Sequence, residues 1–484
     1  MTLTNLLKGS PHKLLQGSKD VQVARIVYDS RQVTPQSLFV ALTGSRVDGH
    51  QYVADAFNRG ASAVIVERPV AQSGPCAVIE VDNTRMALAE FASRFYEYPA
   101  DDLKLIGITG TNGKTSVSFL VRHLLQQAGH RCGLIGTVEY DLGARVVPAM
   151  RTTPESPEIH EYLAAMVTEG CIYGVMEVSS HALLQYRVHD LKFDTVAFTN
   201  LTQDHLDYHG SMENYYEAKR SLFELHAKGG MIVNGDDQYG SLLAQEYAVT
   251  TVGKTESARL RIEAVELDQS GSRFRFDGTQ FQTPLIGRHN VENSAMAIAI
   301  VQQAAGISLD QCVEGLVKAR PVPGRLEAIE ENQPFGVYVD YAHTDDALSN
   351  VLEALREITP GKLQVVFGCG GNRDAGKRGK MGRVASELAD AVTVTTDNPR
   401  NEDPSIIAQQ IAEGCSSVKQ EGWRIELDRA RAIDEVLRSA QPGDTVLVAG
   451  KGHETYQEVN ESVIPFDDRE QTRTILANLG FERQ

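Results

Sequence analysis

The stretch from Leu103 to Gly129 constrains the fold most, because it predicts a buried strand, a glycine turn and a helix in succession. Leu103–Thr109 is short, apolar and β-prone, as expected for a parallel strand covered on both faces. After the turn, apolar residues at three-to-four spacing predict an amphipathic helix that begins near Lys114 and is capped by Gly129. Such a strand, turn and helix gather backbone N–H groups and the positive end of the helix around one anion.

The residues at the start of this helix favour a nucleotide as that anion. Lys114 suits terminal phosphates and Thr115 suits Mg²⁺, although Ile108 stands where the strict phosphate-binding loop has its first glycine. A strand–turn–helix without phosphate chemistry is the alternative, and the Lys-Thr pair argues against it. We therefore expect the chain to bind ATP or GTP, through Gly110, Thr111, Asn112, Gly113, Lys114, Thr115 and Ser116.

Composition limits the class of protein. A length of 484 residues predicts about three domains, and 42% hydrophobic with 23% charged residues is typical of a soluble globular protein. We expect no membrane span and no signal peptide, since no long apolar run occurs and the first residues lack the charged-then-apolar pattern. A net charge of −17 argues against nucleic-acid binding. Six scattered cysteines without a CxxC pair predict buried thiols in a reducing compartment.

The pattern of strands and helices predicts an α/β protein with three domains. Residues 1–98 mix short strands and turns; in them Asp29–Arg31 and Thr43–His50 follow strands and are either ligand loops or surface turns. Residues 99–323 have a β-α-β rhythm that predicts a central P-loop-type parallel sheet. The rhythm restarts after the rigid joint Pro321–Arg325, so residues 324–484 are predicted to form a Rossmann-like domain.

Polar clusters follow most of the predicted strands in both halves. Because the carboxyl ends of parallel strands meet at one edge of a sheet, each half should present its clusters together. Two such edges facing one cleft would be an enzyme's architecture. The clusters are Arg151–Ser156, Glu177–His181 and Asn200–Asp207 in the first half, and Asp340–His343, Gly368–Arg373, Asp397–Arg400 and Gly450–Glu454 in the second.

These motifs, in this order, resemble the Mur ligase family of peptidoglycan synthesis over essentially the whole chain. The resemblance also rests on Asp29-Ser30-Arg31, Ala218-Lys219, His289-Asn290 and Pro323-Gly324-Arg325. It implies an ATP-dependent amide ligase of the bacterial cytoplasm that activates a carboxylate as an acyl phosphate. Within the family, the chain is similar to members that add meso-2,6-diaminopimelate to the D-glutamate γ-carboxylate of UDP-N-acetylmuramoyl-L-alanyl-D-glutamate. We expect a monomer with no nucleic-acid partner.

The resemblance implies roles for individual residues. It assigns catalysis to Lys114, Glu177, His205 and Lys219, the last as a carbamylated lysine made with CO₂. It places Mg²⁺ at Thr115, Glu177, His205 and Lys219. It extends the ATP site to Asn290, Arg325 and Asp340, and it assigns the nucleotide-sugar to Ser30, Thr152, Thr153, Ser179, Gln185 and Arg187.

Selection of the amino acid is implied by the intact Asp-Asn-Pro-Arg loop at 397–400. Arg400 offers a fork for the distal carboxylate of diaminopimelate, and a carboxylate or amide beside it accepts from the distal ammonium. L-Lysine lacks that carboxylate and would leave Arg400 unpaired, which is costly in a buried site. The residues implied for diaminopimelate are Arg373, Asp397, Asn398, Pro399, Arg400, Gly450 and Glu454.

Four alternatives stay open at this point. Folylpolyglutamate synthase shares the central and C-terminal plan, and the lysine-adding ligase differs mainly at residues 397–400. A GTPase-type switch is disfavoured because no Asn-Lys-x-Asp loop follows a strand, and an inactive scaffold is disfavoured by the intact Lys114 and Glu177. Two departures from the family pattern are Arg151, where some relatives have asparagine, and Asp345, where proline is usual.

Overall fold

The computed structural model describes residues 1–44, 47–70, 76–268, 270–460 and 462–482. Ser45 and Arg46 of the Thr43–His50 segment therefore lie outside the described residues. The chain divides into two compact units. The first is Met1–Thr109, Gly129–Ala197 and Glu217–Met231, and the second is Gly110–Ala128, Phe198–Tyr216 and Ile232–Gln484.

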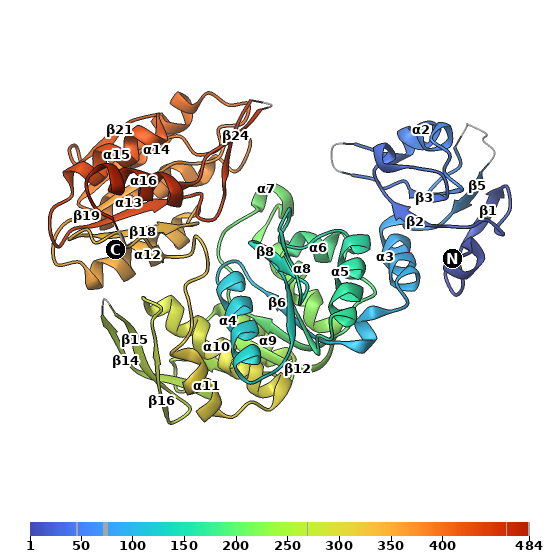
Figure 1. Cartoon of the computed structure of the whole chain (residues 1–484), viewed down its shortest axis with the longest axis horizontal. Helices are drawn as coiled ribbons and strands as arrows, with labels where there is room; N and C mark the ends of the chain where they lie inside the picture. Colours follow the sequence, from blue (N-terminus) through green and yellow to red (C-terminus); the bar gives the residue numbers. More distant parts are fainter. Residues whose placement is uncertain (45–46, 71–75, 269, 461, 483–484) are drawn as a thin grey trace. The chain divides into compact units, whose positions relative to one another are not determined.

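The N-terminal part of the first unit is a five-stranded sheet in the order β1-β5-β4-β3-β2. Figure 1 shows this part in blue, with β1, β2, β3 and β5 labelled. Strands β2 to β5 are parallel and β1 is antiparallel to β5. Its elements are α1 (Leu3–Leu6), β1 (Lys13–Gln16), β2 (Arg25–Val27), η1 (Ser30–Gln32), β3 (Ser37–Val40), η2 (Gly49–Tyr52), α2 (Val53–Asn58), β4 (Ala63–Val66), β5 (Ala77–Glu80), α3 (Thr84–Phe95) and η3 (Pro99–Asp102).

Both faces of this sheet are covered, as the continuous apolar strands predict. Because successive side chains of a strand point to opposite faces, Ala63 and Ile65 of β4 pack with residues of α1 and α3. Val64 and Val66 pack on the other face with residues of α2. The sheet is therefore a middle layer with helices on each side.

The rest of the first unit carries strands in the order β9-β8-β7-β10-β6-β11-β12. Strands β7, β10 and β6 are parallel, as predicted, whereas β8 and β9 form an antiparallel extension that the sequence pattern did not reveal. The elements are β6 (Lys104–Thr109), β7 (Cys132–Ile135), β8 (Glu139–Asp141), β9 (Val146–Pro148), α5 (Ser156–Thr168), β10 (Tyr173–Glu177), α6 (Ser180–Leu184), β11 (Phe193–Phe198), the π-helical turn η4 (Leu222–His226), and α8 (Met212–Ser221) and β12 (Ala227–Asn234), which both continue from one unit into the other.

The second unit begins with α4 (Lys114–Gln127), which packs against α10 (Arg288–Ala305) and α11 (Leu309–Leu316). Strands β12, β13 and β14 are parallel, and β14, β15 and β16 form an antiparallel addition to the sheet. The remaining elements of this part are α7 (Leu206–His209), α9 (Gln238–Glu246), β13 (Thr250–Gly253), β14 (Leu260–Asp268), β15 (Gly271–Phe276) and β16 (Thr279–Thr283).

Residues 327–478 form a six-stranded sheet in the order β17-β18-β22-β19-β20-β21, in which all but β17 run parallel. The elements are β17 (Glu327–Ala328), β18 (Gly336–Asp340), α12 (Asp345–Ile358), β19 (Leu363–Phe367), α13 (Gly376–Leu388), β20 (Ala391–Val394), α14 (Pro404–Ser416), β21 (Trp423–Ile425), α15 (Arg429–Ser439), β22 (Thr445–Ala449), the hairpin β23 (Tyr456–Val459) and β24 (Ser462–Pro465), and α16 (Asp468–Asn478).

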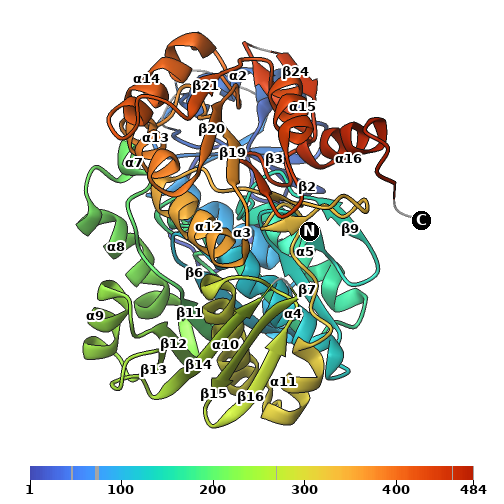
Figure 2. The same cartoon turned by 90° about the vertical axis from the view of Figure 1, so that its left-hand side faces the viewer.

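This sheet is covered on both faces, as expected for a Rossmann-like domain. One core joins it to α12, α13 and α14, and another joins it to α15 and α16. Figure 2 shows these two groups of helices on opposite sides of β19 and β20. Because β18, β22, β19 and β20 are parallel, the loops after all four strands emerge at one edge of the sheet. All six cysteines are buried thiols, as predicted, and no described helix is long and apolar enough to cross a membrane.

Candidate functional site

The predicted phosphate loop is built on glycines that no other residue replaces easily. Gly110 has φ +147° and Gly113 has φ +83°, and a Cβ on Gly110 would come 1.9 Å from Thr199 Oγ1. The loop is held by Thr111 N–H, which donates to Asn200 O at 2.8 Å, and by Asn112 N–H, which donates to Asn200 Oδ1 at 2.9 Å. The turn is therefore fixed at the N-terminus of α4, where an anion is favoured.

Lys114 and Thr115 lie where this anion site needs them. The Lys114 ammonium donates to the carbonyls of Gly110 at 2.9 Å and Thr111 at 2.8 Å, so the side chain folds back over the loop. Thr115 is buried, and its hydroxyl accepts from Arg325 Nη2 at 3.4 Å. A lysine and a hydroxyl at the N-terminus of a helix match terminal phosphates and their metal ion.

The other residues predicted for ATP connect to this loop through the second unit. Buried Asn290 accepts from Asn293 Nδ2 at 3.4 Å, and Asn293 Oδ1 is 2.6 Å from where a Cβ on Gly113 would lie. Asp340 accepts from the N–H groups of Leu326 and Ala342, and burial raises the pKa of Asp340 although Arg325 opposes the shift. The Arg325 guanidinium stacks 4.6 Å from the centre of the Tyr341 ring. This Arg–Tyr pair offers a flat surface beside the loop.

An acidic group also contacts the phosphate loop. Asn112 Nδ2 donates to Asp346 Oδ2 at 2.7 Å, and Thr202 Oγ1 donates to the same oxygen at 3.3 Å. Burial raises the pKa of this carboxyl. Asp345, which departs from the family pattern, and Asp346 begin α12. Asp346 is therefore a direct hydrogen-bond partner of the phosphate loop.

His205 lies in a short charged segment of the second unit. Its side chain is half exposed, its backbone has φ +54°, and its Nε2 is 3.4 Å from Asp204 Oδ2. Burial would raise the pKa of Asp204, but His205, His343 and Lys377 bring it below the ordinary value. Asp204 is therefore a charged carboxylate at this point, next to the predicted histidine.

In the first unit, Glu177 lies at the end of β10 and is fully buried. Its two carboxylate oxygens accept from the N–H and the hydroxyl of Thr137, both at 2.9 Å. The Thr137 hydroxyl is also 3.1 Å from that of Thr152, and Thr153 donates to the Glu177 carbonyl at 2.8 Å. Glu177, Thr152 and Thr153, predicted from separate motifs, therefore form one cluster.

Ser179, Gln185 and Arg187 join the same cluster. The Thr153 hydroxyl donates to Ser179 Oγ at 3.2 Å, and Arg187 donates to the Thr153 carbonyl at 2.7 Å and to Gln185 Oε1 at 2.6 Å. Ser30 is different: it is buried in η1, and among the described residues no side-chain hydrogen bond links it to this group. Five of the six residues predicted for the nucleotide-sugar are thus brought together.

Glu155, which the sequence analysis did not single out, organises three arginines in this region. Its Oε1 is 3.0 Å from Arg187 Nε and 2.8 Å from Arg151 Nη1, and its Oε2 is 3.7 Å from Arg85 Nη1. Glu155 is only 6% exposed. One carboxylate facing three guanidinium groups leaves a net positive cluster, which suits an anionic ligand.

Lys219 lies in α8 and is 1% exposed. A lysine is almost never buried to this degree without a specific role or partner. Across the described residues, no group of three or more His, Cys, Asp or Glu side chains has the arrangement of a metal site.

The loops at 397–400 and 450–454 come together at the carboxyl edge of the C-terminal sheet. Asn398 Nδ2 donates to Glu454 Oε2 at 2.9 Å, and a Cβ on Gly450 would lie 2.6 Å from Asp397 Oδ2. Burial raises the pKa of Glu454, while Lys451 opposes the shift. Two carboxylates and an amide therefore face one small region, which suits a bound ammonium.

Arg400 lies beside this region in a strained conformation. Its backbone has φ +52°, its Nη1 donates to the Gly371 carbonyl at 2.9 Å, and its Nε is 2.5 Å from Glu458 Oε2. The hairpin β23–β24 holds the backbone as well, because Arg400 N–H donates to Glu458 O and Arg400 O accepts from Asn460 N–H. Pro399 is buried next to it, whereas Arg373 is exposed and makes no described hydrogen bond to the group.

Three residues that sequence analysis missed support these loops: Lys451, Glu458 and Arg429. Lys451 lies inside the Gly450–Glu454 cluster, so the sequence already indicated that it is near a candidate site. Glu458 lies in a short alternating stretch that predicts a strand but does not indicate that Arg400 is its ion-pair partner. Arg429 is fully buried and donates to the carbonyls of Thr396 and Ala449, one residue before each loop.

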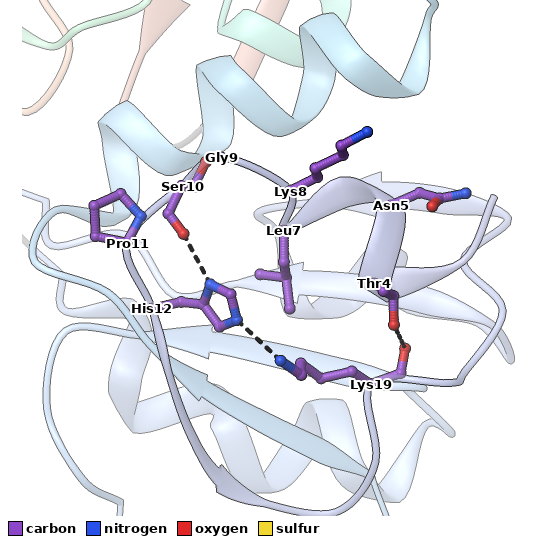
Figure 3. Close-up of a pocket in the computed structure, with 9 residues that line it drawn as sticks. All are labelled: Thr4, Asn5, Leu7, Lys8, Gly9, Ser10, Pro11, His12 and Lys19. Carbon is purple, nitrogen blue, oxygen red and sulfur yellow. Dashed lines mark hydrogen bonds between the residues drawn. The ribbon is translucent and has the colours of Figure 1, made fainter.

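A separate hollow of about 390 Å³ lies in the N-terminal part of the first unit and contains none of the predicted site residues. Figure 3 shows His12 at its centre, between Ser10 and Lys19. The Ser10 carbonyl accepts from Nδ1 at 2.8 Å, so Nε2 accepts from the Lys19 ammonium at 3.4 Å. The polar groups at its centre already bond to one another, and the hollow carries no functional assignment.

Comparison with known proteins agrees with this geometry. The Mur ligase family catalytic domain matches residues 22–96, the Mur ligase middle domain matches 108–301, and the Mur ligase glutamate ligase domain matches 324–452. The UDP-N-acetylmuramoyl-L-alanyl-D-glutamate–2,6-diaminopimelate ligase of Caldanaerobacter subterraneus subsp. tengcongensis is 42% identical over 99% of each chain. The ligase of the same name from Solibacter usitatus is 42% identical over 98% of this chain and 97% of its own.

A solved structure of a protein with that same ligase name covers 99% of both chains, with 31% identity and a TM-score of 0.67. Three domain matches in order, full-length relatives and this structural likeness agree on one family. The chain belongs to the Mur ligase family.

Proposed function

We propose that the chain is an ATP-dependent ligase that adds meso-2,6-diaminopimelate to the D-glutamate γ-carboxylate of UDP-N-acetylmuramoyl-L-alanyl-D-glutamate, in peptidoglycan precursor synthesis. One observation carries the choice of amino acid. Asp397 and Glu454 offer carboxylate oxygens as acceptors for an ammonium, Asn398 donates to Glu454 and so holds that carboxylate, and Arg400 lies on the same loop as a donor for a carboxylate. The distal end of diaminopimelate carries both groups on one carbon.

The proposed reaction has two steps, and in each the bond that forms is matched by one that breaks. An oxygen of the γ-carboxylate attacks the γ-phosphorus of ATP, and ADP leaves. The amine of diaminopimelate then attacks the acyl carbon, inorganic phosphate leaves with the carboxylate oxygen, and the amine gives up a proton. Lys114 and the positive N-terminal end of α4 neutralise the transferred phosphoryl group, while the arginines around Glu155, Arg187 among them, bind the anionic nucleotide-sugar.

We also propose Mg²⁺ as the cofactor, held by Thr115, Glu177 and His205 together with ATP oxygens. Mg²⁺ takes few protein ligands in nucleotide sites and usually keeps several waters. Glu177 supplies a buried carboxylate at the end of β10, an oxygen ligand of the kind that Mg²⁺ prefers. When bound, the ion would screen the charge of the phosphates during transfer.

The buried Lys219 supports a further proposal, that CO₂ carbamylates it to a carboxylate that helps hold Mg²⁺. Formation of the carbamate joins a neutral lysine nitrogen to CO₂ and releases a proton. The test is ¹³C NMR of the protein in ¹³C-bicarbonate, where we expect a carbamate signal that Lys219→Met abolishes. A signal that persists in the variant would overturn this assignment.

The function itself is tested by mass spectrometry of the ligation product. Reactions would contain ATP, Mg²⁺, bicarbonate and the UDP-N-acetylmuramoyl-dipeptide, with meso-diaminopimelate in one tube and L-lysine in another. We expect the tripeptide product with meso-diaminopimelate only. Product with L-lysine instead would keep the ligase but refute the role of the 397–400 loop, and no product with either would refute the function.

The division into residues 1–98, 99–323 and 324–484, binding the nucleotide-sugar, ATP and the amino acid respectively, is also proposed. Each of the three domain matches falls inside one of these ranges. We further propose a monomeric enzyme of the bacterial cytoplasm, where its nucleotide substrates are made. Light scattering coupled to gel filtration at assay concentration would test the oligomeric state.

A further inference from the structure

Lys451 is a charged side chain that is completely buried at the carboxyl edge of the C-terminal sheet. It lies two residues after the end of β22, its side chain is 0% exposed, and its ammonium lies 3.0 Å from Glu454 Oε2 and 3.2 Å from Asn398 Oδ1. The ammonium is also 5.6 Å from the centre of the Tyr456 ring. A cation buried this completely needs such partners, because an isolated ammonium away from water is very costly.

Lys451 fixes the orientation of the Asn398 amide. The amide oxygen accepts from Lys451 and from Glu458 N–H at 3.0 Å, so the amide nitrogen must face Glu454, to which it donates at 2.9 Å. Without the ammonium, one of the two donors that hold the oxygen is lost. The side chain could then turn its oxygen toward the carboxylate.

Lys451 is also the closest positive charge to Glu454. Burial and the negative charge of Asp397 raise the pKa of Glu454, and Lys451 and Asn398 oppose them. The other charged or titratable groups that face this region are Arg429, Tyr341 and Tyr456, while Arg400 and Glu458 act on Tyr456. Arg429 is already paired with Asp468, so Lys451 is the cation that directly balances the Asp397–Glu454 pair.

We infer that Lys451 is a positioning residue that keeps the Glu454 carboxylate charged and Asn398 correctly oriented, so that the site recognises the distal ammonium of its amino acid. The inference rests on the proposed function and names a residue that acts through Glu454 and Asn398 without touching the ligand. A purely structural role in the 450–454 turn is the competing explanation. The two differ in pH dependence, because only the first depends on the charge of Glu454.

The test is the pH profile of KM for meso-diaminopimelate in Lys451→Met, Glu454→Gln and the double variant, from pH 6 to 9. Removing Lys451 raises the pKa of Glu454 further, so the carboxylate becomes protonated at a higher pH. We expect KM of Lys451→Met to rise about tenfold or more as pH falls, the size of one lost charge-assisted hydrogen bond. It should recover toward the wild-type value at high pH, and kcat and the KM for ATP should change little.

The double variant separates the two explanations. If Lys451 acts through the charge of Glu454, adding Lys451→Met to Glu454→Gln has little further effect and the pH dependence disappears. Lys419→Met is the matched control, because this lysine of the same domain lies in the loop between α14 and β21, away from the proposed site, and its ammonium donates to the Ala389 carbonyl at 3.0 Å. A KM change in Lys451→Met that is independent of pH, or additive with Glu454→Gln, would overturn the inference.

Two checks keep the outcomes distinct. A wild-type enzyme that forms no product with meso-diaminopimelate refutes the proposed function, whereas normal wild-type activity with an unchanged Lys451→Met profile refutes only this inference. If Lys451→Met unfolds the C-terminal sheet, the double variant remains informative, because it removes the unbalanced buried carboxylate along with the lysine. Failure of the double variant to restore folding would contradict the charge argument.

Discussion

The ion pair between Arg429 and Asp468 should be the largest single polar contribution to the stability of the C-terminal sheet. Both side chains are 0% exposed, and Arg429 donates from Nε and Nη2 to the two Asp468 oxygens, each at 2.7 Å. It also donates to Ala449 O at 2.9 Å and to Thr396 O at 3.3 Å. Arg429→Met would leave a buried carboxylate and two carbonyls without these donors.

The magnitude follows from burial. Breaking a buried pair by removing one partner costs about 3–5 kcal/mol of unfolding free energy. The control is Arg438→Met, because Arg438 and Asp434 of the same helix form an ion pair at 2.8 Å in which the side chains are 53% and 32% exposed. An exposed pair of this kind contributes only about 0–1 kcal/mol. The exposed single contact and the buried two-bond contact therefore predict a clear difference between the two variants.

The assay uses the single tryptophan of the chain. Trp423 lies in β21, donates to the Lys419 carbonyl at 3.1 Å and packs against the core of this sheet, so its fluorescence reports unfolding of that sheet. With a urea slope of about 2 kcal/mol per molar, Arg429→Met should lower the midpoint by about 2 M. Adding Asp468→Leu should recover part of the loss, since it removes the buried charge but not the unsatisfied carbonyls.

Two results would refute this reasoning. One is an Arg429→Met midpoint indistinguishable from that of Arg438→Met. The other is a double variant that is less stable than Arg429→Met. Because Thr396 and Ala449 precede the two loops of the proposed amino-acid site, we also expect a higher KM for meso-diaminopimelate in Arg429→Met.

Further predictions concern the phosphate loop, the specificity loop and acid sensitivity. Gly110→Ala should abolish ATP binding measured by calorimetry, because its Cβ would overlap Thr199, whereas Gly129→Ala, with φ +85° and open space around the Cβ, should cost stability but keep ATP binding. Arg400→Lys should raise KM for meso-diaminopimelate about 10- to 100-fold through loss of the forked contact, with an unchanged KM for ATP; equal KM values would contradict the proposed carboxylate contact. His160 is 1% exposed, neither ring nitrogen has a hydrogen-bond partner among the described residues, and burial lowers its pKa to about 4. Because this folded-state pKa lies below the unfolded value, the associated stability is present above pH 6.5 and is lost as pH falls toward 4. Hydrogen exchange of α5 should accelerate in that range in the wild type and much less in His160→Leu, and identical profiles would refute the assignment.

Much of the secondary structure was predictable because it depends on residues that are close together in the sequence. The strands Gly336–Asp340 and Leu363–Phe367 belong to the β-α-β rhythm predicted for residues 324–484, since a short apolar run between turn residues has few other interpretations. The antiparallel strands between residues 260 and 283 alternate buried and exposed side chains, a period that is itself a local property of the sequence. The strands β8, β9 and β21 were missed because each has only three residues, too few to show a period.

Some residues of the candidate site could also be placed from the strand pattern, whereas others could not. Glu177 is the last residue of a strand, and Lys114, Asp397 and Arg400 follow soon after strands. A parallel sheet brings the carboxyl ends of its strands to one edge, so the approximate placement of each residue within its own sheet followed from the strand pattern. The clustering of Thr152 and Thr153 with Glu177 is consistent with that argument. Arg373 and Ser30, which were assigned by resemblance alone, are not joined to their groups by described hydrogen bonds.

The sequence by itself determined the succession of strands, turns and helices, the glycine loop, and the polar clusters at the ends of strands. Periodicity and turn chemistry, on which these depend, are local properties of the chain. Only the tertiary structure decided which charges are buried and which partners balance them. Lys451 meets Asn398 across 53 residues, Arg429 meets Asp468 across 39, and Arg85 approaches Glu155 from another helix. The energy of a charge depends on the solvent and partners around it, and these are set by distant segments that pack together only when the chain folds.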